Sequence, residues 1–184
     1  MMHVTAPLLT HGPAGFARGT MILTPWGRRP VETLVPGDLI WTEAGAEPLR
    51  WTGTKTICGL RQPKAAANRP IRIGTSAPFV REGYMPLVVG PGQRIVLAGG
   101  EITLNLGAQR IATAATNLRH LPSVSEELGE PTIDYVSLHL NARAVIDANG
   151  FWTEARGPAS IPADVTAADQ GIFEDPAATA PLAI

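Results

Sequence analysis

The chain has 184 residues and a formal net charge of −1, with 15 Lys and Arg against 16 Asp and Glu, so no bulk charge recruits nucleic acid or an acidic membrane surface. Hydrophobic residues make up 45% of it and charged residues 17%, which excludes disorder caused by charge and low hydrophobicity. The single cysteine excludes an internal disulfide framework and a cysteine-based zinc site.

Short apolar runs separated by turn signals make up the middle of the chain. Predicted strands lie at 20–24, 39–42, 47–58, 71–73, 87–89, 94–97 and 101–104. Pro25-Trp26-Gly27 forms a turn after the first of these strands, and Gly99-Gly100 joins the last two as a hairpin. Residues 61–69 are polar or small and are expected to form a loop.

The pattern changes only briefly further along the chain. Residues 111–118 are rich in alanine and predict one short helix. Residues 135–140 and 144–146 are expected to pair as strands, and Asn149-Gly150 is expected to turn the chain into a last apolar pair. Many short strands with frequent turns favour an all-β sandwich or barrel. No GxGxxG segment or phosphate loop is present, which argues against nucleotide chemistry and predicts no cofactor.

The two ends of the chain are expected to lie outside the folded domain. Residues 1–14 hold neither a basic region nor an apolar run of signal-peptide length. No segment reaches the roughly 18 apolar residues that a membrane helix needs. We therefore expect a soluble, cytoplasmic protein, with export by a non-classical route left open. Residues 158–184 are rich in Pro and Ala and predict a largely unpacked tail with one short helix over 163–170.

Several blocks of the sequence carry a resemblance to a known family. Residues 15–25 read Gly-Phe-Ala-Arg-Gly-Thr-Met-Ile-Leu-Thr-Pro, and residues 30–40 read Pro-Val-Glu-Thr-Leu-Val-Pro-Gly-Asp-Leu-Ile. Further blocks follow in the matching order at 48–53, 69–73, 87–97 and 135–154. Over residues 15–157 the chain resembles the Hint (hedgehog/intein) domain in its bacterial hedgehog-type branch. The resemblance implies an all-β flattened horseshoe of two intertwined, pseudo-symmetric halves, to which the pattern adds the one short helix.

The resemblance also implies self-cleavage, for which this chain lacks the expected groups. In such domains a Cys or Ser at the first residue attacks the preceding carbonyl in an N-to-S/O acyl shift, and a Thr-x-x-His block and a later His assist. The matching positions here are Gly15, Gly90, Gln93 and Arg143. Glycine has no side chain, glutamine exchanges no proton near neutral pH, and arginine is permanently charged. We therefore predict no catalytic residues at these positions and a degenerate site.

Three other residues are weak candidates for a substituted reaction centre. Thr20 carries a hydroxyl but matches a structural position, and Cys58 at the end of a strand is expected to be a packed, inert thiol. His139 alternates with leucines and is expected at the surface or in a hydrogen bond. An autoprocessing enzyme that uses Thr20 or Cys58 with His139 is the alternative function. Four scattered histidines without paired spacing predict no metal site.

The tryptophans raise the question of a binding surface. Trp41 and Trp51 lie in strand runs and are expected in the core, whereas Trp26 lies at a loop tip and is a candidate for binding. Arg28-Arg29 beside it is expected to be a solvated pair.

The remaining polar positions have structural interpretations. Asp38, in Pro-Gly-Asp, is expected to bond backbone N–H groups of its own turn. His120 is expected to interact with the end of the predicted helix.

These observations lead to a non-catalytic Hint-like domain of a bacterial-type protein that serves as a scaffold or interaction module after losing self-cleavage. A decayed domain without selected activity is a third reading. A protein partner is left open, and no nucleic acid, membrane or small-molecule cofactor is expected to bind.

Overall fold

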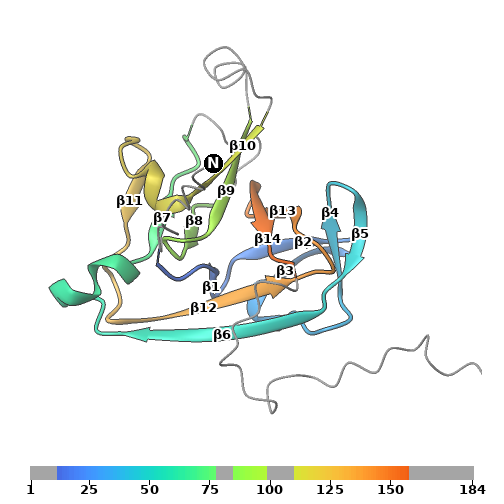
Figure 1. The fold of residues 1–184 in the computed structure, drawn as a ribbon, viewed down its shortest axis with the longest axis horizontal. Helices are drawn as coiled ribbons and strands as arrows, with labels where there is room; N and C mark the ends of the chain where they lie inside the picture. Colours follow the sequence, from blue (N-terminus) through green and yellow to red (C-terminus); the bar gives the residue numbers. More distant parts are fainter. Residues whose placement is uncertain (1–11, 78–84, 99–109, 158–184) are drawn as a thin grey trace, which may run out of the picture.

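The computed structural model describes residues 12–77, 85–98 and 110–157 (Figure 1). The strands are β1 (Phe16–Ala17), β2 (Met21–Thr24), β3 (Gly27–Pro30), β4 (Leu39–Thr42), β5 (Gly45–Pro48), β6 (Trp51–Cys58), β7 (Ile71–Ile73), β8 (Leu87–Val89), β9 (Arg94–Ala98), β10 (Arg110–Ala114), β11 (Val124–Glu126), β12 (Thr132–His139), β13 (Ala144–Ala148) and β14 (Phe151–Ala155). Short 3-10 helices lie between them: η1 (Val31–Thr33), η2 (Pro63–Asn68) and η3 (Ala115–Leu118). The all-β prediction is confirmed.

The strands form two sheets, and the chain alternates between them. One sheet has six strands in the order β11-β7-β8-β1-β12-β6, and the other has eight, with β10-β9-β14-β13-β2-β3 in line and β4 and β5 joined through β13. The connections from β1 to β2, β8 to β9 and β12 to β13 all lead from the first sheet into the second. The halves of the chain are therefore interleaved in space rather than placed side by side.

The longest pairing is that of β6 with β12, which extends along one side of the molecule in Figure 1. Its antiparallel register begins with Trp51 opposite His139 and ends with Cys58 opposite Thr132. β6 is the last strand of its sheet, and its middle residues Thr54, Lys55 and Thr56 are exposed. The Trp51 end of the pair lies near the second sheet, whereas the Cys58 end extends away from it (Figure 1).

The core fills the space between the two sheets. Strands with alternating burial supply it, as in β14, where Phe151, Thr153 and Ala155 are buried and the residues between them are only partly so. Strands of both sheets contribute large buried aliphatic and aromatic side chains, among them Phe16, Ile22, Ile40, Ile71, Ile73, Leu87, Tyr135, Ile95 and Phe151. Full burial of one such side chain contributes about 1.5–3 kcal/mol, so this shared core holds the interleaved sheets together.

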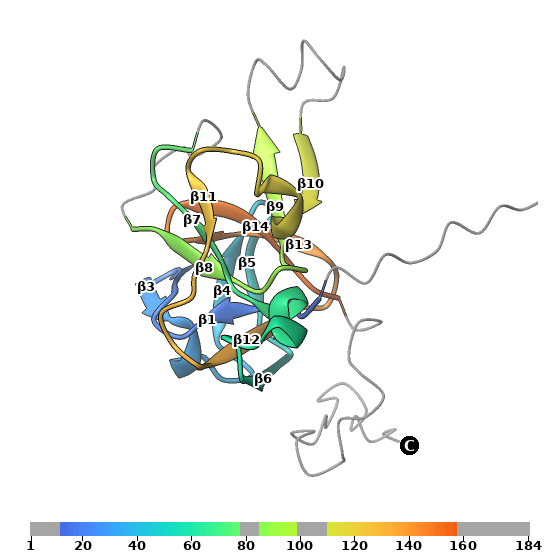
Figure 2. The ribbon, with the colours of Figure 1, turned by 90° about the vertical axis from the view of Figure 1, so that its left-hand side faces the viewer.

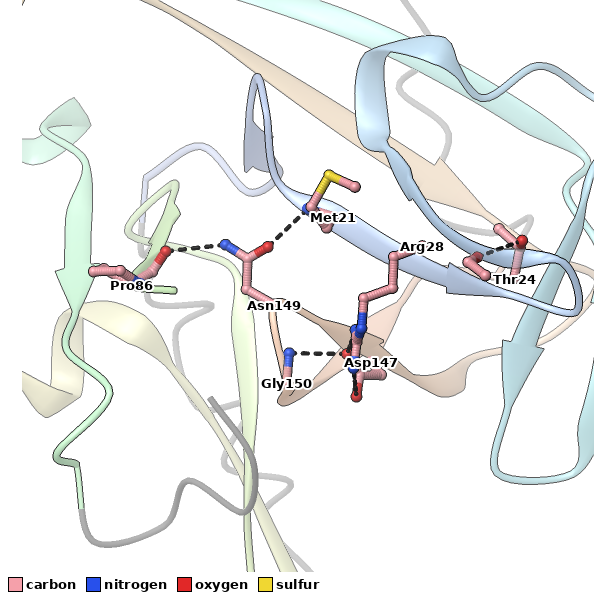
Figure 3. A network of polar contacts seen from close by, with 8 residues as sticks. Met21, Thr24, Arg28, Pro86, Asp147, Asn149 and Gly150 are labelled. Carbon is pink, nitrogen blue, oxygen red and sulfur yellow. Dashed lines mark hydrogen bonds and ion pairs between the residues drawn. The ribbon is translucent and has the colours of Figure 1, made fainter. Parts of the chain in front are cut away.

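A polar corner at the β13–β14 turn ties three segments together (Figure 3). Asn149 has a left-handed backbone, with φ of 52°, which asparagine tolerates better than most residues. Its side-chain Oδ1 accepts a 2.8 Å hydrogen bond from the Met21 backbone N–H, and its Nδ2 donates a 3.0 Å bond to the Pro86 carbonyl. Arg28 forms a two-pronged ion pair with Asp147 beside it. We call these residues the Asn149 corner.

Two local predictions were wrong because sheet partners override local propensity. The predicted helix over 111–118 is instead the strand β10, which pairs with β9, followed by the 3-10 helix η3. The predicted strand 47–58 divides into β5 and β6, which belong to different sheets. The break lies at Leu49 and Arg50, whose backbone N–H groups bond to the carbonyls of Asp38 and His139. The predicted loop 61–69 contains the 3-10 helix η2.

The predicted pairing of 135–140 with 144–146 was also wrong. β12 pairs with β6 and β1 in one sheet, while β13 pairs with β14, β2 and β4 in the other. The turn at Asn149-Gly150 is confirmed, as is the strand at 94–97. The predicted strand 101–104, the Gly99-Gly100 turn and the tail helix over 163–170 lie outside the described residues. Within the described ranges, no helix is long and apolar enough to cross a membrane.

Candidate functional site

The segment that leads into β1 and two connections between the sheets meet at one place, and they hold the positions that the family resemblance singled out. Gly15 immediately precedes β1, Gly90 and Gln93 lie between β8 and β9, and Arg143 immediately precedes β13. A pocket of about 240 Å³ is lined by Gln93 and Arg143 together with Ala14, the neighbour of Gly15. The tertiary structure therefore brings these distant blocks together, and we call this place the crossover junction.

The upstream backbone passes directly over the two glycines of the β8–β9 connection. The Gly90 N–H donates a 2.9 Å hydrogen bond to the Gly15 carbonyl, and the Gly92 N–H donates one of 2.9 Å to the Pro13 carbonyl. A Cβ atom on Gly90 would lie 2.4 Å from the Pro13 oxygen, and one on Gly92 would lie 2.4 Å from the Gly12 oxygen. The absent side chains are therefore what admits the upstream segment.

Gly15 is constrained by its own backbone as well as by its neighbours. Its φ is +135°, which residues with a side chain rarely adopt. A Cβ there would lie 3.0 Å from the Val136 carbonyl oxygen and 3.1 Å from the Tyr135 Cβ. The preceding carbonyl, that of Ala14, accepts a 3.4 Å hydrogen bond from the Ser137 hydroxyl. The position where a nucleophile was expected thus has neither a side chain nor space for one in this conformation.

Gln93 is buried and engaged in joining two strands. Its Nε2 donates a 2.8 Å hydrogen bond to the Glu154 carbonyl in β14. Its backbone N–H bonds to the Gly90 carbonyl, and its own carbonyl accepts from Ala115. The amide therefore links the start of β9 to β14 and is not directed at the Ala14 carbonyl.

Charged side chains gather around the same pocket. The Glu154 carboxylate lies 2.7 Å from the Arg94 Nε and 3.8 Å from the Arg143 Nη1. Arg156, two residues after Glu154, also lines the pocket. Burial lowers the pKa of Arg156, and the neighbouring positive charge of Arg143 lowers it further. Cationic groups therefore outnumber the carboxylate at the junction.

His139 is buried at the edge of the junction rather than at the surface, and of the two predicted alternatives it is the hydrogen-bonded one that the structure shows. Its ring stands edge-on to the Trp51 indole, with ring centroids 4.7 Å apart. It ends β12 just where the chain leaves for the second sheet, and it bridges to Arg156. Burial lowers the pKa of His139, a hydrogen bond with the Gly157 backbone opposes this, and the Arg156 charge lowers it further. The imidazole is therefore neutral at neutral pH.

The structure does not unite the other candidates with His139. Thr20 is buried and donates its hydroxyl to the Ala17 carbonyl at 2.7 Å. Cys58 is exposed, which corrects the prediction of a packed thiol. It lies at the far end of the β6–β12 pair from His139, about 23 Å away at roughly 3.3 Å per strand residue. A Cys58–His139 pair is therefore excluded by distance.

The tryptophans divide differently from the prediction. Trp51 is buried as predicted, but Trp41 is 48% exposed because its strand β4 presents that face to solvent. Trp26 is 74% exposed at the turn between β2 and β3, as expected for a loop tip.

The Arg28-Arg29 pair is not simply solvated, since each guanidinium has a carboxylate partner. Arg28 pairs with Asp147, and Arg29 pairs with Asp38 at 3.0 Å. Asp38 also accepts a 2.9 Å hydrogen bond from the Val35 N–H, which confirms its role in the turn. His120 Nδ1 lies 2.9 Å from the Asn117 carbonyl of η3, as expected for a residue near the end of a helix.

Sequence reasoning missed the polar residues that complete the junction: Arg94, Ser137, Glu154 and Arg156. One signal was available, because Glu154 and Arg156 lie two residues apart shortly after the predicted apolar pair, and such residues share a face if the chain continues as a strand. Their partners come from other strands, which no local pattern identifies. In the described part of the chain, no three His, Cys, Asp or Glu side chains lie together as a metal site would require.

The comparison with protein families decides the relationship. A family model described as "Hint domain" matches residues 14–159. The chain belongs to the Hint domain family. No curated protein matches this Hint domain.

Solved structures similar to this Hint domain are intein-type proteins. The crystal structure of the gp41-1 intein shares 10% identity at a TM-score of 0.47, covering 77% of this chain and 98% of its own. The solution structure of a bacterial intein-like domain from Clostridium thermocellum shares 10% identity at a TM-score of 0.49, covering 79% and 100%. A splice-inactive variant of the AceL NrdHF class 3 split intein shares 13% identity at 0.44, covering 76% and 95%.

Proposed function

We propose that this Hint domain does not cleave itself and serves as a scaffold or interaction module. The observation that carries the proposal is the backbone of Gly15. Self-cleavage needs a side-chain nucleophile beside the scissile carbonyl, because attack depends on close, aligned approach. Gly15 has no such group, its φ of +135° disfavours one, and the Val136 carbonyl occupies the space beside it.

The surrounding groups support the same conclusion for proton transfer. The Gln93 amide is bonded to the Glu154 carbonyl, and an amide neither gains nor loses a proton near neutral pH. The Arg143 guanidinium stays charged and faces Glu154. Neither Gln93 nor Arg143 can therefore act as the general acid for the departing amine at the Ala14–Gly15 bond.

One contact favours the alternative, an autoprocessing domain with substituted residues. The Ser137 hydroxyl lies 3.4 Å from the Ala14 carbonyl oxygen, where it could donate to the charge that develops on attack. Thr20 would then have to give up its bond to the Ala17 carbonyl to act as the nucleophile. This is the weaker candidate because the contact is long and Thr20 is already satisfied.

Intact-mass spectrometry separates the two functions. Purified protein is incubated for days with and without dithiothreitol or hydroxylamine, which intercept thioesters and esters. We expect an unchanged full-length mass. Loss of residues 1–14 from the wild type would overturn the proposal, and its absence in Ser137→Ala or Thr20→Val would assign the alternative mechanism. Gly129→Ala, at an exposed glycine whose added Cβ would meet only the end of the flexible Glu127 side chain, is the control for nonspecific proteolysis.

A further inference from the structure

The polar side chains of the junction pocket differ in how fully they are engaged. Arg94 is held twice, since its Nε lies 2.7 Å from the Glu154 carboxylate and its Nη2 donates a 2.7 Å bond to the Ala112 carbonyl. The Gln93 Nε2 is bonded to the Glu154 backbone. These two side chains build the wall of the pocket and have little capacity left for a ligand.

Arg143 and Arg156 are in a different position. Arg143 reaches Glu154 only at 3.8 Å, and its side chain is 64% exposed. Among the described residues no carboxylate pairs with the Arg156 guanidinium, and the charge it feels most is the repulsive one of Arg143. Two partly buried cationic groups thus share one pocket, and the Glu154 carboxylate that lines it is already engaged by Arg94.

Such an arrangement is unfavourable without an anion. Like charges held close together repel, and removing a guanidinium from water is costly unless a counter-charge is present. With three arginines and one glutamate, the pocket has a surplus of two positive charges. A guanidinium binds tetrahedral and planar oxyanions through paired N–H donors. Charge balance selects a phosphoryl group, which carries about −1.5 to −2 at pH 7, over a singly charged carboxylate.

The size of the pocket limits what can enter. Its volume of about 240 Å³ is smaller than the roughly 300–1,000 Å³ of sites that enclose whole small-molecule ligands. It suits a single charged group presented by a larger molecule or a free ion. We propose that the crossover junction is a phosphoryl-binding site. Arg143 and Arg156 bind the oxyanion, and Glu154 forms an ion pair with Arg94. Binding does not depend on whether the domain cleaves itself, so this proposal and the preceding one can fail separately.

The test is a titration of the intact chain with inorganic phosphate. Thermal unfolding and isothermal titration are measured at constant ionic strength, with sodium phosphate replacing sodium chloride, and acetate serves as the singly charged comparison. A ligand that binds only the folded state raises the unfolding temperature. We expect phosphate to stabilise the protein and acetate to do so much less. Equal effects of phosphate, acetate and chloride would overturn the proposal.

Substitutions at the two arginines distinguish a site from general charge. Arg143→Gln and Arg156→Gln are each expected to weaken phosphate binding about tenfold or more, because each removes charge-assisted hydrogen bonds. Without phosphate, neither should lower the unfolding temperature, since each relieves repulsion. The matched control is Arg72→Gln, which removes an arginine of the other sheet that pairs loosely with Glu127 at 3.7 Å. A loss of binding in Arg72→Gln equal to that in Arg143→Gln would also overturn the site.

A phosphoserine peptide of neutral flanking sequence identifies the source of the group. If it competes with inorganic phosphate in the wild type and not in Arg156→Gln, the ligand is a phosphorylated chain. If only inorganic phosphate binds and loses affinity in Arg156→Gln, the site takes the free ion. Both results support a phosphoryl site, and binding that is unchanged in Arg156→Gln contradicts it.

Discussion

The Asn149 corner and the crossover junction contain the same kinds of polar groups but differ in whether their charges are balanced. Both lie where segments of different strands converge, and both contain arginine, a carboxylate and a side-chain amide. In the corner every charge has a counterpart, because Arg28 and Asp147 pair in two-pronged fashion and Asn149 uses both ends of its amide (Figure 3). In the junction Arg143 and Arg156 exceed what Glu154 can neutralise. A network in which every charge has a partner, as in the corner, fits a structural role. A network with excess positive charge, as in the junction, fits the proposed binding of an anion.

The largest change in unfolding free energy is expected from substitution of Asn149, which removes the hydrogen bonds of the Asn149 corner. Asn149→Ala removes two hydrogen bonds and places alanine at a φ of 52°; about 2–4 kcal/mol of unfolding free energy should be lost. Denaturant unfolding measures it. Glycine adopts this backbone conformation without strain, so Asn149→Gly loses only the two hydrogen bonds. Its unfolding free energy should therefore lie between those of Asn149→Ala and the wild type. Equal stability of alanine and wild type would contradict the structural role of the corner.

A smaller loss is expected where the upstream segment crosses the junction. Gly90→Ala places a Cβ 2.4 Å from the Pro13 oxygen, and such overpacking costs about 1–3 kcal/mol. Limited proteolysis should also release the N-terminal residues sooner than in the wild type. Gly129→Ala, whose Cβ would meet only the flexible Glu127 side chain, is the matched control and should show neither change. An unaffected Gly90→Ala would mean that the upstream segment does not need the glycine.

His139 gives the junction a modest dependence on pH. Its pKa is lowered in the folded state, by burial first and by the Arg156 charge, against the opposing Gly157 hydrogen bond. The unfolded chain therefore binds a proton more readily below about pH 6.5, and stability declines as the pH falls from there toward the folded pKa. The unfolding free energy should therefore depend less steeply on pH in His139→Gln than in the wild type across that range. An identical slope in both would assign the dependence to other groups.

The smallest effect is expected at the loop tip outside both regions. Trp26 is 74% exposed, so Trp26→Ala should change the unfolding free energy by no more than about 0.5 kcal/mol. The unfolding temperature measures this, with Trp51→Ala, a buried indole, as the contrasting variant. A large loss in Trp26→Ala would mean that the tip packs against the domain.

Long-range partners explain which residues of the junction could be identified from the sequence. The blocks around Gly15, Gly90, Gln93 and Arg143 were recognisable because each is a local pattern in the right order, and the structure gathers them at one junction. Arg94, Glu154 and Arg156 were missed because they become a cluster only when β9 and β14 pair. Figure 2 shows β12 between β1 and β6 in the first sheet. His139 is buried because β12 ends where the chain leaves for the second sheet and bridges to Arg156, so alternation no longer reports exposure there.

The sequence by itself determined the all-β class, most strand positions and the Asn149-Gly150 turn. These follow from period-two alternation, turn chemistry and residue identity, which are local properties. Tertiary structure alone decided that β10 is a strand, that Trp41 is exposed and that Arg143 and Arg156 share a pocket with the Glu154 carboxylate. Each depends on a partner brought close by the interleaved sheets, and no local pattern records that distance.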